Sequence, residues 1–184
     1  VLGASSRFAG STGLQATKVE AQIPDLSHTV VAVSADARGP LPELLALMTS
    51  SPLAAMTGHA LDQASGTGAA DLRLRLSLPI SELHKSRVQG SLQLAGNEVR
   101  ITPDTPALSR ARGTVQFSAT GFTLPGVQPR ALGGDVRLEG GMRALPTGAP
   151  PSDAPLQLRA QGTASAEGLR QAPELGLLAQ LARK

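Results

Sequence analysis

Alternation of apolar and polar residues dominates the chain, and its clearest example is the stretch DLRLRLSLPI at residues 71–80. Leucines occupy every second position there, and Arg73, Arg75 and Ser77 stand between them. In a β-strand successive side chains point to opposite faces, so this strand has one apolar and one polar face. The same period predicts further strands over 14–23, 29–38, 87–95, 98–102, 113–120, 122–125, 135–139 and 155–161.

A β-hairpin is predicted around Gly96–Asn97, because this pair suits a two-residue turn and alternating segments stand on both sides of it. The turn would pair Leu92 with Ile101. It would also pair Leu94 with Val99, so that apolar residues meet on one face of the hairpin.

A second hairpin is predicted around Thr120–Gly121, which would pair Phe117 with Leu124. The strands are then interrupted by a segment rich in proline, 144–154, which is predicted to be a loop. Because short alternating strands make up most of the chain, we expect a mainly β protein.

Two segments change to the period of an α-helix. The first carries apolar residues at i, i+3, i+4 and i+7, namely Leu41, Leu44, Leu45 and Met48. Ser51–Pro52 then has the sequence of a helix start, and a second short helix is predicted to end at Gly58. The segment 165–184 is also predicted to be helical, bent or divided at Pro173.

Composition narrows the function classes. The 184 residues suffice for one domain with a sizeable core. Lys and Arg number 17 against 14 Asp and Glu, and the chain has three Phe and neither Trp nor Tyr. No nucleic-acid partner is expected, because the sequence has neither a basic run nor aromatic stacking platforms. The absence of Cys excludes disulfides, and no apolar run reaches the roughly 20 residues of a membrane span.

No catalytic, metal or cofactor site is predicted. The three histidines, His28, His59 and His84, are isolated and lack the spacing of a metal site. The stretch GTGAAD at 66–71 resembles the start of a dinucleotide-binding loop, but it lacks the third Gly and precedes a strand instead of following one. We therefore expect a protein that is not an enzyme and uses no cofactor.

The apolar faces of the strands admit two interpretations. In a two-layer sandwich they pack against a facing sheet about 10 Å away. The inward positions are mainly Leu and Val, however, with few bulky rings to fill a thick core. A smooth aliphatic surface also suits an acyl chain, since about 14 buried carbons at ~0.8 kcal/mol each offer ~11 kcal/mol before any costs. Periodicity alone leaves both a packed core and a lined groove open.

Several motifs follow one another from Ala35 to the end of the chain. They are the GPLPELLALM helix, the SP pair that opens the second helix, leucine strands that end in LPI, the SRVQG strand, NEVRITPDTP, and GTVQFSATGF followed by ALGG. GTASAEGL, a helix entry, comes last. In these motifs the chain resembles the AsmA-like superfamily of envelope proteins, and most of all its YhdP-type branch.

This resemblance implies an internal section of a much longer periplasmic protein of Gram-negative bacteria, anchored in the inner membrane; both ends of the chain look cut. The body of such a protein would be an elongated, curled, antiparallel-rich sheet that forms an apolar groove, with short α-helical insertions. The implied function is passive transport of phospholipid between the inner and outer membranes. Its partners would be phospholipid acyl chains and, through parts of the parent protein outside this chain, both membranes.

The resemblance also divides the chain and assigns roles to residues. Strands of a preceding section are expected at 1–39, a helical pair at 40–62, a β-sheet section at 63–165 and the helix of a next section at 166–184. The arginines between the leucines would face the periplasm. Thirteen apolar residues are expected to line the groove and to face lipid tails: Leu72, Leu74, Leu76, Leu78, Val88, Leu92, Leu94, Val99, Ile101, Val115, Phe117, Val136 and Leu138.

Two other functions fit the same pattern. A structural or scaffolding periplasmic protein with a closed, dry core predicts that the change Leu74→Glu unfolds the chain. A chaperone-like holder of outer-membrane proteins would bind extended peptides at its sheet edges by strand addition. A lipid conduit would instead bind acyl chains, and some of its lining positions would tolerate a charge in folding while losing function.

Overall fold

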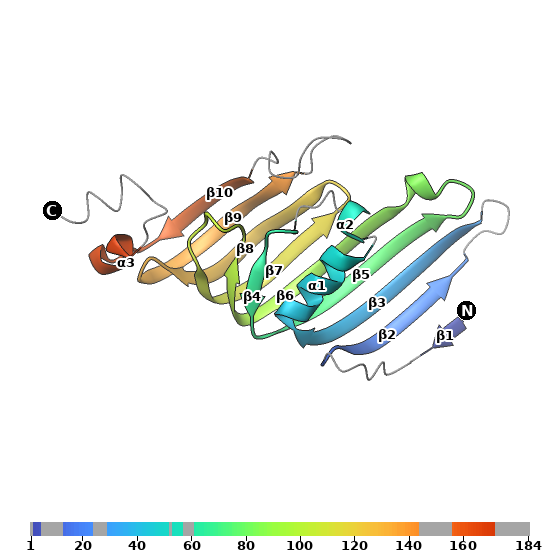
Figure 1. Cartoon of the computed structure of the whole chain (residues 1–184), viewed down its shortest axis with the longest axis horizontal. Helices are drawn as coiled ribbons and strands as arrows, with labels where there is room; N and C mark the ends of the chain where they lie inside the picture. Colours follow the sequence, from blue (N-terminus) through green and yellow to red (C-terminus); the bar gives the residue numbers. More distant parts are fainter. Residues whose placement is uncertain are drawn as a thin grey trace.

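The strands form a single antiparallel sheet in a computed structural model of the chain (Figure 1). The structure describes residues 2–4, 13–23, 29–51, 53–56, 61–143 and 156–171. The strand order is β1-β2-β3-β5-β6-β7-β8-β9-β10, and β4 pairs with β6 beside this path. The mainly β, antiparallel fold with short helices is confirmed. The bounds are β1 Leu2–Ala4, β2 Gln15–Gln22, β3 Val30–Pro40, β4 Ser65–Thr67, β5 Ala69–Pro79, β6 Arg87–Arg100, β7 Leu108–Ser118, β8 Gly121–Ala131, β9 Gly134–Arg143 and β10 Leu156–Gly162.

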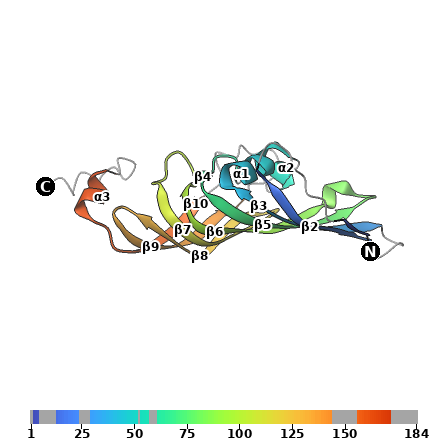
Figure 2. The same ribbon diagram turned by 90° about the horizontal axis from the view of Figure 1, so that it is seen from below.

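Short helices accompany the sheet. Within the described ranges they are α1 Leu41–Ser50, α2 Leu53–Met56, the 3-10 helix η1 Leu83–Lys85 and α3 Ala166–Arg170. Figure 2 shows α1 and α2 on one side of the curved sheet. The four apolar residues of the predicted first helix are all buried in α1. Gly58, the predicted loop 144–154 and the part of the predicted last helix after residue 171 lie outside the described residues.

The sheet has one apolar and one polar face, as the alternation predicts. On β5, Leu72 and Leu74 are buried, whereas Arg73 and Arg75 are exposed. The buried apolar residues form one core cluster that runs from α1 across the strands from β5 to β9. Because α1 buries its own apolar stripe on this face, the helix and the sheet supply opposite sides of the same core.

The prediction of a hairpin around Gly96–Asn97 is wrong. β6 runs through both residues without a turn. Leu92 therefore pairs with Leu72 on β5 and with Val115 on β7, and not with Ile101. Beyond Asn97 the strand leaves β5 and pairs with β4. The segment that was expected to fold back thus extends the sheet.

Asn97 occupies a β-bulge instead of a turn. The pairing of β6 with β7 shifts register on both sides of it, and Asn97 is only 2% exposed. Its amide oxygen accepts a hydrogen bond from the Ala95 N–H (2.8 Å), and its amide nitrogen donates to the carbonyls of Thr67 (3.0 Å) and Ala69 (2.9 Å). Gly96, at φ +107°, suits a bulge as well as a turn. The two carbonyls that favour the bulge over a turn, those of Thr67 and Ala69, belong to the β4–β5 corner, which is remote in sequence.

The second hairpin is present, but its register differs from the prediction. The turn consists of Ala119–Thr120, so Phe117 pairs with Phe122 and not with Leu124. Gly121, predicted to be a turn residue, is the first residue of β8. The loop therefore begins one residue earlier than the glycine suggests.

β8 also continues well past its predicted end at Pro125. Proline normally ends pairing in a sheet because it has no N–H to donate. Here the pairing of β8 with β9 shifts register between Leu124 and Val127, so that Pro125 and Gly126 fall in the irregular stretch. The strand then resumes and buries Val127 on the apolar face.

The β8–β9 turn holds the start of α3. The Leu132 carbonyl accepts a hydrogen bond from the Ser165 N–H (2.9 Å), and the Asp135 carbonyl accepts one from the Thr163 N–H (3.1 Å). The Ser165 hydroxyl caps the helix by accepting from the Gly168 N–H (3.0 Å). A Cβ on Gly168 would overlap the Leu132 carbonyl oxygen, so the close approach of the two backbones requires glycine.

The change Asn97→Ala is expected to lower the free energy of unfolding by about 2–4 kcal/mol, because it leaves three backbone groups without their hydrogen bonds. Urea-induced unfolding measures this difference. The matched control is Gln93→Ala on the same strand, where the amide accepts one exposed hydrogen bond from Thr114. Equal stabilities of the two variants would show that the Asn97 amide does not hold the bulge.

The change Gly168→Ala is expected to detach α3 from the β8–β9 turn, since the added methyl group cannot fit against Leu132. Hydrogen exchange of the Ser165 amide, which is bonded to this turn, should become faster. Glu167→Ala is the control, because its ion pair with Arg170 (3.2 Å) is exposed and contributes little. Unchanged exchange in Gly168→Ala would contradict the close contact.

Candidate functional site

A small apolar cavity lies between α1 and the sheet. Its volume is about 50 Å³, and every residue that lines it is apolar. One wall consists of the buried residues of α1, and the other comes from the apolar faces of β5 to β9. A cavity without polar groups stays dry, because water finds no hydrogen-bond partner in it.

The structure places the thirteen predicted lining residues on the apolar side, with different degrees of burial. Nine are buried: Leu72, Leu74, Val88, Leu92, Leu94, Ile101, Val115, Phe117 and Leu138. Four are half-buried: Leu76, Leu78, Val99 and Val136. Those that line the cavity under α1 are Leu72, Leu92, Leu94, Val99, Ile101, Val115, Phe117 and Leu138.

Several residues of the cavity were missed by reasoning from the sequence. Phe122 and Leu124 line it from β8, and Val127 lines it beyond the proline at which the strand was predicted to end. Leu108 and Ala111 line it from the start of β7, ahead of the predicted strand. The alternation of Phe122 and Leu124 in the sequence could have identified these two residues. Leu108, Ala111 and Val127 could not be found in this way, because their positions depend on bulges.

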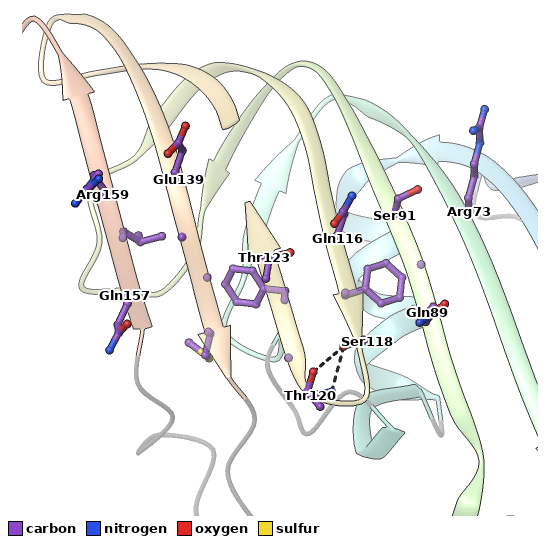
Figure 3. A pocket seen from close by; sticks show the side chains of 18 of the residues that line it. Arg73, Gln89, Ser91, Gln116, Ser118, Thr120, Thr123, Glu139, Gln157 and Arg159 are labelled. Carbon is purple, nitrogen blue, oxygen red and sulfur yellow. Dashed lines mark hydrogen bonds between the residues drawn. The ribbon is translucent and has the colours of Figure 1, made fainter. Parts of the chain in front are cut away.

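The polar face of the sheet carries a much wider hollow (Figure 3). Its volume is about 1420 Å³, and its lining comes from β5 to β10. The lining combines side chains that alternation places on the polar face, among them Arg73, Gln89, Gln116 and Arg159, with apolar ones such as Phe117, Phe122 and Met142. The sequence indicates that this face is polar but not that it is concave, because the concavity arises from the shape of the whole sheet.

The polar side chains of the hollow form hydrogen bonds with near neighbours in the sequence. The hydroxyls of Ser118 and Thr120 in the hollow are 2.9 Å apart, and Arg137 Nε donates to Glu139 Oε1 (2.7 Å). Glu139 is the one carboxylate among its lining residues, which include neither His nor Cys. A general acid–base pair or an activated nucleophile needs a second such group nearby.

His84 and the GTGAAD stretch lie in different parts of the structure. His84 is exposed in η1, while His28 and His59 lie outside the described residues. The GTGAAD stretch forms the β4–β5 corner, where the Gly68 carbonyl accepts a hydrogen bond from the Leu41 N–H (2.7 Å). Across the described ranges, no three His, Cys, Asp or Glu residues gather into a metal site, and no helix is long and apolar enough to cross a membrane.

Comparison with known proteins identifies one family. The family model of the YhdP protein matches residues 4–182, which is nearly the entire chain and includes the first strands, where the sequence motifs are weakest. No curated protein and no solved structure matches the chain.

The change Leu44→Ala is expected to lower the free energy of unfolding by about 2–5 kcal/mol, because Leu44 is 1% exposed and its loss enlarges the cavity under α1. Leu47→Ala on the same helix is the control, since Leu47 is 39% exposed and lies outside the cavity. Chemical denaturation of both variants measures the difference. A similar, small loss for both would mean that α1 does not pack firmly on the sheet.

Proposed function

The chain belongs to the YhdP family, and we propose that it forms one section of an envelope-spanning conduit that carries phospholipid passively between the inner and outer membranes. The acyl chains travel along the apolar face of the sheet, and the polar face is turned to the periplasm. No bond is made or broken, and no cofactor takes part. The section works as a part of a longer protein that is anchored in the inner membrane.

The observation that carries this proposal is the coverage of the apolar face. The described strands all belong to one sheet, so short helices, and not a second sheet, cover its apolar side. The apolar cluster extends from Ala35 on β3 to Leu158 on β10. A surface that is apolar across this many neighbouring strands can contact a hydrocarbon chain at every step of its movement.

The size of the cavity under α1 limits where an acyl chain can lie. At about 10–15 Å³ for each water-sized group, a cavity of about 50 Å³ holds only a few of them. A chain of about 14 carbons therefore cannot enter this cavity unless α1 moves away from the sheet. With α1 packed on the sheet, lipid passes over parts of the apolar face that this helix leaves uncovered.

A structural role is the second candidate, and the close packing under α1 favours it. Leu44, Val88 and Val127 are almost completely buried, which is typical of a closed core. A scaffold of this kind contacts no lipid at any position of the sheet. The two functions therefore differ in whether phospholipid contacts the sheet, which can be measured directly.

Photo-crosslinking in cells tests the conduit, with the full-length protein and a photoreactive residue at one position at a time. Positions 76, 122 and 138 sample the apolar face, and positions 75 and 116 sample the polar face. We expect phospholipid adducts at one or more apolar positions and at neither polar position. Adducts only to protein at all three apolar positions would contradict the conduit and leave the scaffold.

A further inference from the structure

Three arginines stand together on the polar face of β5 and β6. Arg73 and Arg75 alternate with leucines along β5, so their backbone positions are about 6.8 Å apart. Arg75 pairs with Gln89 on β6, and Arg87 lies two residues before Gln89 on the same face. Diagonal neighbours of this kind are about 7–8 Å apart in an antiparallel pair. We call Arg73, Arg75 and Arg87 the arginine cluster.

The cluster is exposed, and its charges are not neutralised by ion pairs. Other arginines of the polar face are paired, since Arg130 lies 3.4 Å from Asp135 and Arg137 lies 2.7 Å from Glu139. Within the described ranges, none of the three arginines of the cluster forms an ion pair. Keeping like charges this close together without a partner is unfavourable for the free protein. An anion that binds the cluster would relieve this repulsion.

The carboxylates around the cluster are too few to cancel its charge. Asp36 on β3 stands opposite Arg73. Asp71, two residues before Arg73, is paired with Arg38 (3.5 Å). No other acidic residue pairs in register with the cluster on β3 or β6. Three positive charges therefore face one opposing carboxylate.

The choice of arginine favours binding over solubility alone. Lysine keeps a surface soluble as well as arginine does, yet the chain contains 14 Arg and three Lys. Arginine is enriched at protein interfaces and lysine is depleted there, because the guanidinium group is planar and more weakly hydrated.

The polar hollow continues from the cluster across the sheet. Arg73 and Arg75 line it on β5, and Arg159 lines it on β10. Figure 3 shows Arg73 and Arg159 at opposite sides of the hollow, with Gln116 between them. The one carboxylate among the lining residues, Glu139, already accepts a hydrogen bond from Arg137. The hollow thus has positive charge at both sides and neutral polar groups in the middle.

The size of the hollow suits a segment of a macromolecule. Its volume of about 1420 Å³ exceeds the roughly 300–1,000 Å³ of most small-molecule pockets. Five strand spacings of about 4.8 Å separate β5 from β10, which gives a width of about 24 Å. About seven residues of an extended polypeptide cover this width.

The chemistry of the lining suits a polypeptide with acidic side chains. Arginine binds a carboxylate with two parallel hydrogen bonds. Carboxylates on alternate residues of an extended segment are about 6.8 Å apart, which matches the spacing of Arg73 and Arg75. The amides of Gln116 and Gln157, which line the hollow, both donate and accept, as peptide groups do. A membrane surface is flat and does not enter a concave hollow.

We propose that the polar hollow and the arginine cluster form a docking surface for an acidic segment of a protein partner. The carboxylates of the segment bind the cluster, and its backbone crosses the glutamines toward Arg159. This surface lies on the opposite face of the sheet from the apolar core. The inference therefore goes beyond the proposed function and holds whether or not the apolar face carries lipid.

The first test measures binding of a model peptide to the purified full-length protein by fluorescence anisotropy. The probe is a labelled peptide of alternating Glu and Ser, about 12 residues long, so that it spans the hollow. We expect the double variant Arg73→Gln, Arg75→Gln to bind it at least about tenfold more weakly than the wild type, because it loses two charge-assisted contacts.

A matched variant separates a specific surface from general attraction. Arg110→Gln with Arg170→Gln removes the same charge from β7 and α3, outside the hollow, and should weaken binding by no more than about twofold. Arg73 and Arg75 are exposed, and their double variant should keep wild-type stability in urea.

Three outcomes of this test would overturn the docking surface. The first is a wild-type protein that does not bind the peptide. The second is equal weakening in the two double variants, which would show attraction by net charge alone. The third is binding that depends on Arg73 and Arg75 to vesicles of phosphatidylglycerol and not to the peptide, which would assign the cluster to a membrane. None of them bears on the apolar face, which lipid crosslinking tests separately.

Photo-crosslinking in cells supplies a second measurement, with a photoreactive residue in place of Gln116 in the full-length protein. We expect an adduct to another protein that is lost in the Arg73→Gln, Arg75→Gln background and kept in the Arg110→Gln, Arg170→Gln background. Mass spectrometry of the adduct should find the crosslinked peptide rich in Asp and Glu. An adduct that persists without Arg73 and Arg75, a crosslinked peptide without acidic residues, or no protein adduct would contradict the proposal.

Discussion

The buried amide of Asn97 joins three backbone segments that would otherwise separate. It bonds the carbonyls on both sides of Gly68 and the amide of Ala95 on its own strand. The Gly68 carbonyl in turn accepts the N–H of Leu41, the first residue of α1. One side chain therefore fixes the bulge of β6, the corner between β4 and β5, and, through that corner, the start of the helix that covers the core.

This arrangement divides the apolar face into two regions. Near the corner, α1 lies on the sheet and leaves a cavity of only about 50 Å³. At the other end of β5, Leu78 is only half-buried and Ile80 is exposed to solvent. The same leucine pattern thus builds a core at one end and an open surface at the other. Coverage by the helix, and not the composition of the strand, decides between them.

The sequence was a good guide to strands and faces and a poor guide to their connections. Alternation identifies β5 and assigns Leu72 and Arg73 to opposite sides, because it depends only on the period of a strand. Gly96–Asn97 misleads because a bulge and a turn need the same backbone freedom, and the choice depends on the distant β4. For the site, the sequence supplies candidate residues but not their burial. Whether a leucine such as Leu78 is covered depends on where α1 ends, which no local pattern records.

The contact between the β8–β9 turn and α3 fixes the position of this helix. That position therefore does not depend on the length of the connection between β9 and β10. Thr163 and Ser165 bond to carbonyls of the turn, and β10 is already in register with β9 up to Gly162. In the sequence, the connection at 144–155 comes before the residues that make these bonds. Closing a longer connection costs only about 0.6 kcal/mol for each doubling of its length. Related sections can therefore differ in this link, and an engineered insertion can be placed in it, while α3 keeps its place.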